Sequence, residues 1–408
     1  MILGIALLST SFDGAARSQM RAPQPVAHFP EDKKVVEIPF EQYREWIVIP
    51  IRVNETKTLS FILDTGAPIT VISDETLAEP LKLQIAGQAR VGGVGEGEAK
   101  SVPLALNATL DFGGIRITNA IVALGVAAKT IAGADGIIGG PIFNNLVVEI
   151  DWMRKVLRLY KPDQFSYEGK GTSLPISRLA SGHIYTASKV SVNGEEAVSV
   201  NLLVDTGAGH ALSLETGESS SLSKPAKTIT DAIVGWGANG PVRGDYGRIK
   251  SLQLGDYTFK DFVVGFSHES HMNNIGRSSS VELFGNLGQR VLQRFRVVFD
   301  YSRSRMILEP NAHFSEPFSF NTTGIRFAPW KAGVESLEVA VVLKDSPSEA
   351  AGIKTGDRVI QIDGRPVKNI SVNEIESLLE QSPGKELVVT IQRGDGRIEK
   401  RVKHARLI

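Results

Sequence analysis

The four residues Asp-Thr-Gly-Ala occur twice in this chain of 408 residues, at 64–67 and at 205–208, and we call these segments the aspartate loops. Each directly follows a mostly apolar run, so each aspartate is expected where a buried strand ends. A buried carboxylate without partners is costly, and burial raises the pKa of a carboxyl group. Two facing carboxyl groups share a proton, so one serves as base and the other as acid. Asp64 and Asp205 are therefore candidates for a pair that activates water.

Asp-Thr-Gly after a hydrophobic strand, in each half of a chain, resembles the aspartic proteases. Ala67 and Ala208 are similar to the retropepsin-like branch, since the pepsin branch usually has Ser or Thr there. The resemblance implies that Asp64 and Asp205 hold the water that attacks a peptide bond. The supporting active-site residues that it implies are Thr65, Gly66, Ala67, Thr206, Gly207 and Ala208. The alternative is that each loop is only a turn after a strand.

Within this resemblance, Thr65 and Thr206 hydrogen-bond across a two-fold axis, while Gly66 and Gly207 let donor groups reach the carboxylates. The alanine that follows each glycine lacks the hydroxyl that can hydrogen-bond a carboxylate in the pepsin branch. With fewer donors to the charged form, the pKa values of the pair should be higher. We therefore expect a pH optimum that is less acidic than in the pepsin branch.

The sequence around the aspartate loops is itself repeated, over 35–167 and 168–312, which indicates a duplicated β-rich unit. Both repeats carry a glycine-dense stretch after the aspartate loop, as expected for a mobile hairpin that approaches a ligand. In the family a hairpin flap closes over the substrate, and an ordinary flexible loop is the alternative. The flap candidates are Gly92, Gly93, Gly95, Gly235, Trp236 and Gly237.

Two further features follow from the family resemblance. A hydrophobic-hydrophobic-glycine segment braces the catalytic loop in the family, and residues 137–139 and 283–285 fit that role in the two repeats. His210 lies five residues after Asp205, on the loop that lines a substrate subsite in the family. His210 is therefore a subsite candidate, with a surface histidine as the alternative.

The last part of the chain, 313–408, differs from the repeats. Residues 345–364 closely resemble the middle of a PDZ domain of the kind attached to bacterial proteases. A helix is expected from Ser371, which forms a capping box with Glu374. PDZ domains bind an extended peptide, often a free C-terminus, as an added strand beside such a helix. The candidates for the peptide-binding segment are Gly324, Ile325, Arg326 and Phe327.

The composition restricts the chemistry. Forty-five basic and forty-five acidic residues cancel, which gives no support for nucleic acid as a partner. The absence of cysteine excludes disulfides, thiolate catalysis and cysteine-based zinc sites. The chain contains neither the His-Glu-x-x-His zinc motif nor a phosphate-binding glycine loop. We therefore expect neither a metal nor another cofactor.

The chain starts with a short apolar run followed by small residues, which is similar to a signal peptide over 1–16, although the usual basic segment is missing. A buried N-terminal segment is the alternative. Residues 17–34 are rich in proline and charge and are typical of a linker. No later stretch reaches the ~18 apolar residues of a membrane span. We expect an exported protein, periplasmic or secreted.

The predicted fold is mainly β, with two retropepsin- or pepsin-like lobes in a pseudo-two-fold acid-protease fold and an α+β PDZ domain. The predicted function is an aspartic endopeptidase that cuts peptides or unfolded proteins, while the PDZ domain holds peptide tails of a substrate or partner. Pairing of the repeats within one chain, and so a monomer, is favoured over pairing between two chains. The alternatives are a catalytically silent PDZ scaffold and a protease that cuts only itself.

Overall fold

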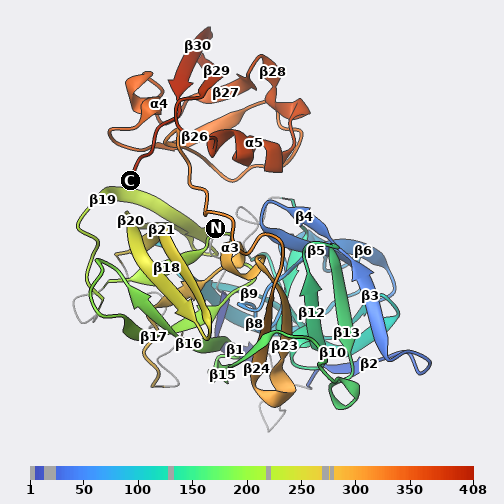
Figure 1. The fold of residues 1–408 in the computed structure, drawn as a ribbon. Helices are drawn as coiled ribbons and strands as arrows, with labels where there is room; N and C mark the ends of the chain where they lie inside the picture. The colour runs from blue at the N-terminus through green and yellow to red at the C-terminus, as the bar shows by residue number, and fades with distance from the viewer. Residues whose placement is uncertain (1–4, 13–23, 127–132, 217–221, 269–274, 276–279) are drawn as a thin grey trace.

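The computed structural model describes residues 5–12, 24–126, 133–216, 222–268, 275 and 280–408. β-strands dominate this part of the chain, and its helices are short. Figure 1 shows two β lobes, one from each repeat, with a smaller C-terminal domain above them. The predicted mainly β fold, with two lobes and a C-terminal α+β domain, is confirmed.

The first lobe is built on a ten-stranded sheet. The strand that leads into the first aspartate loop, β6, lies between β5 and β11, and β11 is parallel to β6 and antiparallel to β7. The strands in their order across the sheet are β1 (Ile5–Phe12), β8 (Gln84–Gly93), β9 (Lys100–Phe112), β10 (Ile115–Leu124), β7 (Thr70–Ile72), β11 (Gly136–Ile138), β6 (Lys57–Leu63), β5 (Trp46–Val53) and β4 (Glu41–Tyr43), with β2 (Val26–His28) paired to β10.

The second lobe repeats this pattern in an eight-stranded sheet. The strand that leads into the second aspartate loop, β17, is parallel to β22, which is antiparallel to β18. The strands in their order across the sheet are β15 (Ser177–Arg178), β16 (Ile184–Ser191), β17 (Val198–Val204), β22 (Gly285–Leu287), β18 (Leu212–Glu215), β21 (Tyr257–Ser267), β20 (Gly240–Leu254) and β19 (Thr228–Gly237).

A six-stranded sheet is shared by the two repeats. Its central pair joins β12 of the first repeat to β23 of the second, with Val148 opposite Phe299. The strands in order are β14 (Thr172–Pro175), β24 (Arg305–Pro310), β23 (Phe295–Asp300), β12 (Val147–Asp151), β13 (Val156–Tyr160) and β3 (Val35–Pro39). Backbone hydrogen bonds therefore tie the two lobes together in one chain.

Helices are few and mostly one turn long in the described residues. Two of them, at 140–143 and 289–292, directly follow β11 and β22, so each packs just beyond an aspartate loop. The helices are α1 (Gly140–Phe143), α3 (Gln289–Leu292), α4 (Pro347–Ala350) and α5 (Val372–Leu379), with 3₁₀ turns η2 (Glu75–Leu77), η3 (Pro162–Gln164), η5 (Tyr301–Arg303) and η6 (Val367–Asn369).

The C-terminal domain has its own apolar core and a twisted sheet flanked by α5. Helix α5 starts as predicted, because the Ser371 hydroxyl accepts a hydrogen bond from the Glu374 N–H. In sheet order the strands are β25 (Ile325–Phe327), β26 (Leu337–Val342), β27 (Arg358–Ile362), β29 (Glu386–Arg393) and β30 (Gly396–Lys403), with β28 (Arg365–Pro366) paired to β27. Among the strands that the structure describes, β25 pairs with β26 alone, so it is an edge strand.

Strand β1 pairs antiparallel with β8, which places residues 5–12 at the edge of the first-lobe sheet. Residues 1–4 and 13–23 lie outside the described part of the chain, and the signal peptide over 1–16 stays a prediction. Among the residues that the structure describes, no helix is long and apolar enough to cross a membrane.

The shared sheet supplies a stability test. Phe299 is completely buried in β23 and packs edge-on against Phe143, with 5.3 Å between ring centres. We expect Phe299→Ala to lower the free energy of unfolding by about 3–5 kcal/mol, because the substitution leaves a cavity between the lobes. Met153→Ala, at a half-exposed position in the turn after β12, is the matched control and should change it by less than about 0.5 kcal/mol. Equal stability of both variants in denaturant titrations would contradict this role of the shared sheet.

Candidate active site

Both aspartate loops are held from below by a second strand. The Asp64 N–H donates to the carbonyl oxygen of Ile138 on β11 (2.8 Å), and the Asp205 N–H donates to that of Leu287 on β22 (3.0 Å). Since β11 and β22 run parallel to the strands that enter the loops, the two aspartates occupy equivalent positions. The duplicated sequence therefore folds into duplicated loops.

The brace of the second loop is not the one expected from the sequence, and that expectation was wrong. Residues 283–285 were expected, but strand pairing puts Leu287 opposite Val204, so the counterpart of 137–139 is 286–288. Leu-Phe-Gly fits an apolar pattern better than Asn-Leu-Gly, yet the strand register decides the position. The third residue of both braces is glycine because a Cβ there would lie within 2.2 Å of a backbone oxygen.

Two threonines lock the loops to each other. The Thr65 N–H donates to the Thr206 hydroxyl and the Thr206 N–H donates to the Thr65 hydroxyl, both at 3.0 Å. Each hydroxyl in turn donates across the two-fold axis, Thr65 to the Val204 carbonyl (2.7 Å) and Thr206 to the Leu63 carbonyl (2.9 Å). All four bonds join one repeat to the other, so neither loop can shift without the other.

The two carboxyl groups meet in the space between the loops. Asp64 is 0% and Asp205 is 1% exposed. Each accepts a hydrogen bond from the glycine N–H two residues on, Asp64 from Gly66 (2.6 Å) and Asp205 from Gly207 (2.8 Å). Burial raises the pKa of Asp64 well above its ordinary value, and the charge of Asp205 and the hydrogen bond between the two groups raise this pKa further. Burial next to a second carboxyl group therefore favours the protonated form of Asp64.

The glycines of the loops are needed for this approach. A Cβ added to Gly207 would lie 2.4 Å from the Asp64 carboxyl carbon, and one added to Gly66 would lie 3.0 Å from that of Asp205. Each glycine thus makes room for the carboxyl group of the other repeat. Ala67 and Ala208 follow as fully buried packing residues.

A residue that the sequence analysis missed makes the pair unequal. The Asn286 side-chain amide donates to Oδ2 of Asp205 at 2.6 Å, and Asn286 is completely buried. The NH₂ group must face the carboxylate, because the amide oxygen would repel it. The equivalent position in the first repeat is Ile137, which has no donor. Asn286 therefore gives Asp205 a side-chain donor that the first repeat does not provide for Asp64.

Trp46 is a second residue that the sequence analysis missed. Its indole N–H donates to the Gly207 carbonyl at 2.8 Å, although the ring belongs to β5 of the first lobe. The ring is 2% exposed and stacks near Tyr43. A buried tryptophan usually has a partner for its N–H, so the available signal was an aromatic residue at the start of the β-rich run 46–53.

The flap candidates lie at the ends of two hairpins, β8–β9 and β19–β20, and the hairpin tips contact each other. Asn239, which the sequence analysis did not single out, connects them. Its N–H donates to Val94 (3.1 Å), its side chain donates to Gly93 (3.0 Å), and its carbonyl accepts from Gly97 (2.9 Å). The structure therefore brings the two predicted flap segments together.

The glycines at these tips allow close backbone contact. A Cβ on Gly237 would lie 1.9 Å from the Val94 carbonyl oxygen. Gly95 has a φ of +124° and lies so close to Gly240 that a Cβ would come within 2.7 Å of its backbone nitrogen. Gly92 and the glycine and tryptophan at 235–236 belong to the strands that lead to the tips.

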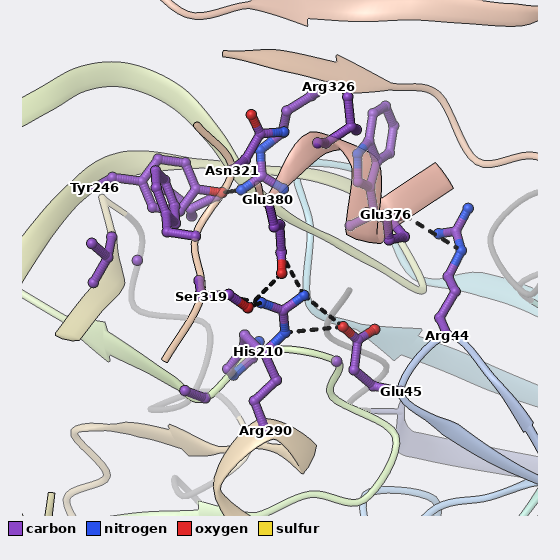
Figure 2. A pocket seen from close by; sticks show the side chains of 18 of the residues that line it. Arg44, Glu45, His210, Tyr246, Arg290, Ser319, Asn321, Arg326, Glu376 and Glu380 are labelled. Carbon is purple, nitrogen blue, oxygen red and sulfur yellow. Dashed lines mark hydrogen bonds and ion pairs between the residues drawn. The ribbon is translucent and has the colours of Figure 1, made fainter. Parts of the chain in front are cut away.

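His210 lines a pocket beside the second aspartate loop, shown in Figure 2. Its Nε2 lies 3.3 Å from the carbonyl oxygen of Asn286, so this nitrogen carries the proton. Burial lowers the pKa of His210 to about 3, which keeps the ring neutral. His210 thus lies in the pocket, as a neutral side chain next to the brace that contacts Asp205.

The candidate peptide-binding residues of the C-terminal domain line the same pocket, with the exception of Gly324. Ile325 and Phe327 are buried in the domain core. Arg326 points away from that core, and its guanidinium donates to the Tyr246 hydroxyl of the second lobe (Figure 2). Gly324 has a φ of +85°, and a Cβ there would lie 2.2 Å from Ser346. No group of side chains able to hold a metal ion occurs among the described residues.

Comparison with known proteins identifies two domain types. The aspartyl protease family model matches residues 49–142 and 188–279, and the PDZ domain model matches 338–393. A protein of Synechocystis sp. named a serine protease, HhoA, is 22% identical over 359 residues, which cover 85% of this chain and 81% of the relative.

Two other relatives match over short segments. The carboxy-terminal processing protease CtpA of Bacillus subtilis is 34% identical over 91 residues, 22% of this chain and 19% of CtpA. A Neisseria meningitidis protein named a zinc metalloprotease is 46% identical over 52 residues, 13% of this chain and 11% of that protein. A solved aspartic proteinase from Irpex lacteus covers 69% of this chain and 99% of its own, with a TM-score of 0.47 and 15% identity.

The relatives are named for different chemistries, so their names do not indicate one type of catalysis. The two matched segments of the aspartyl protease model each contain one aspartate loop, in agreement with the duplicated loops of the structure. Two segments of the chain, one in each repeat, therefore match the aspartyl protease family, and a third segment matches the PDZ domain.

Proposed function

We propose that the protein is an aspartic endopeptidase that hydrolyses peptide bonds with a water molecule held between Asp64 and Asp205. The observation that carries this proposal is the buried carboxyl pair, one member from each repeat, with glycine N–H donors on both. Two buried carboxyl groups in contact destabilise a fold, so their retention at equivalent positions supports a chemical role.

The unequal surroundings of the pair support fixed roles for its members. Asp205, which accepts hydrogen bonds from Gly207 and Asn286, is the ionised member and takes a proton from the water as it attacks the peptide carbonyl. Asp64 holds a proton and donates a hydrogen bond to the carbonyl oxygen as negative charge develops there. The proton taken by Asp205 then passes to the leaving amine, and neither residue forms a covalent bond to the substrate.

The flap hairpins complete the proposed site. Their tips are joined by hydrogen bonds through Asn239, so they must separate for a peptide to enter. Once re-formed over the substrate, the contact excludes bulk water and strengthens the interactions of the carboxyl pair with the reacting groups.

Replacement of either aspartate tests the proposal. We expect Asp64→Asn and Asp205→Asn each to reduce peptide cleavage by at least about 10⁴-fold, because the amide can neither share the proton nor act as a base. Cleavage of a peptide library across pH 3 to 8, read by mass spectrometry, measures this. Asp151→Asn, on an aspartate in the shared sheet away from the pair, is the control. Half activity in each single variant would favour active sites formed between two chains, and no cleavage by the unmodified protein would favour a binding role.

The pH profile tests the roles of the two aspartates. Asn286→Leu removes the side-chain donor to Asp205, so the acidic limb of the pH profile should move to higher pH, because a hydrogen bond to a charged carboxylate favours its charged form. The measurement is kcat/KM against pH. Asn201→Leu, on the neighbouring strand with its amide bonded to Glu282, is the matched control and should leave the acidic limb in place. An unchanged limb in Asn286→Leu would contradict the assignment of Asp205 as base.

Stability against pH gives a test that does not depend on activity. The raised pKa of Asp64 means that the folded protein binds its proton more tightly than the unfolded chain. This contribution to stability is complete below the ordinary aspartate pKa, near 4, and is lost as the pH rises through the folded-state value. Asp64→Asn should therefore be more stable than the unmodified protein at pH 7, and the difference should shrink toward pH 3. A difference that does not vary with pH in denaturant titrations would refute this.

A further inference from the structure

The short helix after the second brace, α3, is bonded directly to the second aspartate loop and the residues that follow it. The His210 ring lies 3.3 Å from the carbonyl oxygen of Asn286, whose amide donates to Asp205. A shift of α3 would therefore change the surroundings of Asp205. The N–H groups of Gly288, Gln289 and Arg290 donate to the carbonyl oxygens of Ala211 (3.0 Å), Ala208 (2.7 Å) and His210 (3.1 Å), respectively.

Arg290 is a position at which the second repeat departs from the first. Strand register aligns Gln289 with Gly140, and the N–H of each donates to the alanine of its own aspartate loop. The next residue is Pro141 in the first repeat, which has neither an N–H nor a charge, and Arg290 in the second. The charged side chain is therefore not required by the fold that the two repeats share.

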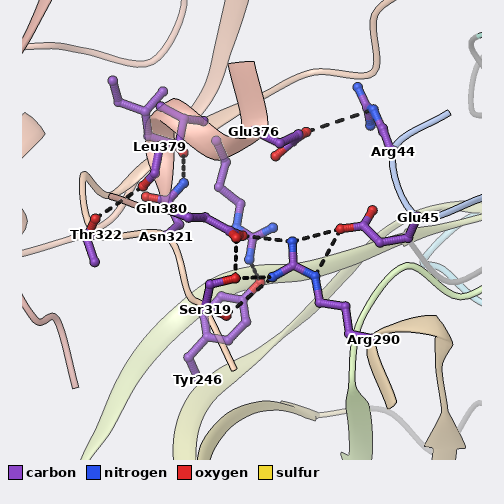
Figure 3. Close-up of polar contacts among 12 residues, drawn as sticks. Arg44, Glu45, Tyr246, Arg290, Ser319, Asn321, Thr322, Glu376, Leu379 and Glu380 are labelled. Atoms are coloured by element: carbon purple, nitrogen blue, oxygen red, sulfur yellow. Dashed lines mark hydrogen bonds and ion pairs between the residues drawn. The ribbon is translucent and has the colours of Figure 1, made fainter. Parts of the chain in front are cut away.

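The Arg290 guanidinium joins three parts of the chain. Figure 3 shows it between Glu45 of the first lobe and Glu380 at the end of α5 in the PDZ domain, both 2.7 Å away. It also donates to the carbonyl oxygen of Ser319 (3.3 Å), in the segment that links the second lobe to the PDZ domain. The side chains of the ion pairs are only 16–21% exposed, so the loss of one partner would leave a poorly solvated charge.

The same face of α5 also holds the first lobe. Asn373, Glu376 and Glu380 are spaced by three and four residues, so they lie on one side of the helix. The Asn373 side chain accepts a hydrogen bond from the Arg44 N–H (2.6 Å) and donates one to the Gln42 carbonyl oxygen (3.2 Å). Glu376 lies 3.9 Å from Nε of Arg44. Helix α5 therefore fixes β4 and the turn after it.

This turn leads to the second aspartate loop by another set of contacts. Glu45 binds Arg290, and the next residue, Trp46, donates its indole N–H to the Gly207 carbonyl oxygen at 2.8 Å. Because Trp46 is 2% exposed, its ring has no room to move without the loop. Two sets of contacts thus connect α5 to the loop of Asp205, one through Arg290 and α3 and one through Glu45 and Trp46.

We infer that the PDZ domain positions the second aspartate loop through α5, with Arg290 as the positioning residue that joins them. The inference rests on the proposed function and deepens it, because the docked PDZ domain becomes part of the scaffold of the active site. Release of α5 from the lobes displaces Asp205 and its donors and so slows peptide cleavage. This role requires no peptide bound to the PDZ domain.

A variant that releases α5 tests the inference. Asn373→Ala combined with Glu380→Lys, which we call the release variant, removes the bonds to the first lobe and places a positive charge against Arg290. We expect kcat to fall by about tenfold or more with little change in KM, because a small misplacement of a catalytic group has a large effect on rate. Glu374→Lys, on α5 but paired with Arg365 inside the PDZ domain, is the matched control and should keep its kcat.

The kinetic constants distinguish positioning from other roles of the PDZ domain. A higher KM at unchanged kcat in the release variant would mean that the domain binds substrate, and unchanged constants would mean that its docking has no part in catalysis. Either result overturns the inference. Arg290→Met should lower kcat as the release variant does, and Arg290→Lys, which keeps the charge, should recover part of it. Equal kcat in these two variants would overturn the role of Arg290.

Hydrogen exchange, read by mass spectrometry, separates this inference from the proposed function because it requires no cleavage. The N–H groups of 288–290 are bonded to the second loop and its following residues, and their exchange should be at least about fivefold faster in the release variant than in Glu374→Lys. The Gly140 N–H, bonded to the first loop, should exchange equally in both. The Arg44 N–H, which loses its acceptor, reports the release of α5.

The two activities can then fail separately. If the unmodified protein cuts no peptide but exchange at 288–290 rises on release, the positioning stands and the proposed peptidase activity fails. If exchange at 288–290 is unchanged although the Arg44 N–H exchanges freely, the positioning falls, whatever the protein cleaves. Equal acceleration at Gly140 would mean general loosening of both lobes, which also overturns it.

Discussion

The contact between two buried carboxyl groups is the constraint on which the rest of the structure depends. Taking a charged carboxylate out of water costs several kcal/mol unless donors replace the water. The loops provide these donors through glycine N–H groups, and the crossed threonine bonds keep the two carboxyl groups from moving apart. The six-stranded sheet beneath joins both repeats by backbone hydrogen bonds, so that the loops stand on a common, rigid base.

The sequence was sufficient for those parts of the site that are local in the chain. Aspartate at the end of an apolar run, followed by Thr-Gly, predicts a loop after a buried strand, and the repeat predicts a second one. The helix at Ser371 was equally predictable, because its cap lies within three residues. These features depend on short-range backbone geometry, which the residue types determine.

The parts that could not be predicted depend on pairing between distant segments. The second brace was misplaced by three residues because the register of β22 against β17 decides which residue lies under Asp205. The same register brings Asn286 to the carboxylate of Asp205. An error in the register therefore hid both the position of the second brace and the role of Asn286. Trp46 and Asn239 act across the lobes, and a single sequence does not identify their distant partners. The pocket between the second lobe and the PDZ domain could not be predicted, because it depends on the position of that domain, which composition and motifs do not provide.

The difference between Asn286 and Ile137 has a consequence for how such a protein can arise. An assembly of two identical subunits must present the same side chain on both sides of its axis, so any donor to one carboxylate is also given to the other. Joining both halves in one polypeptide removes that equality, and each half can then change by itself. The Asn286 amide beside Asp205 is an example. It makes the surroundings of the two carboxyl groups unequal through a difference at one position, which two identical subunits could not have.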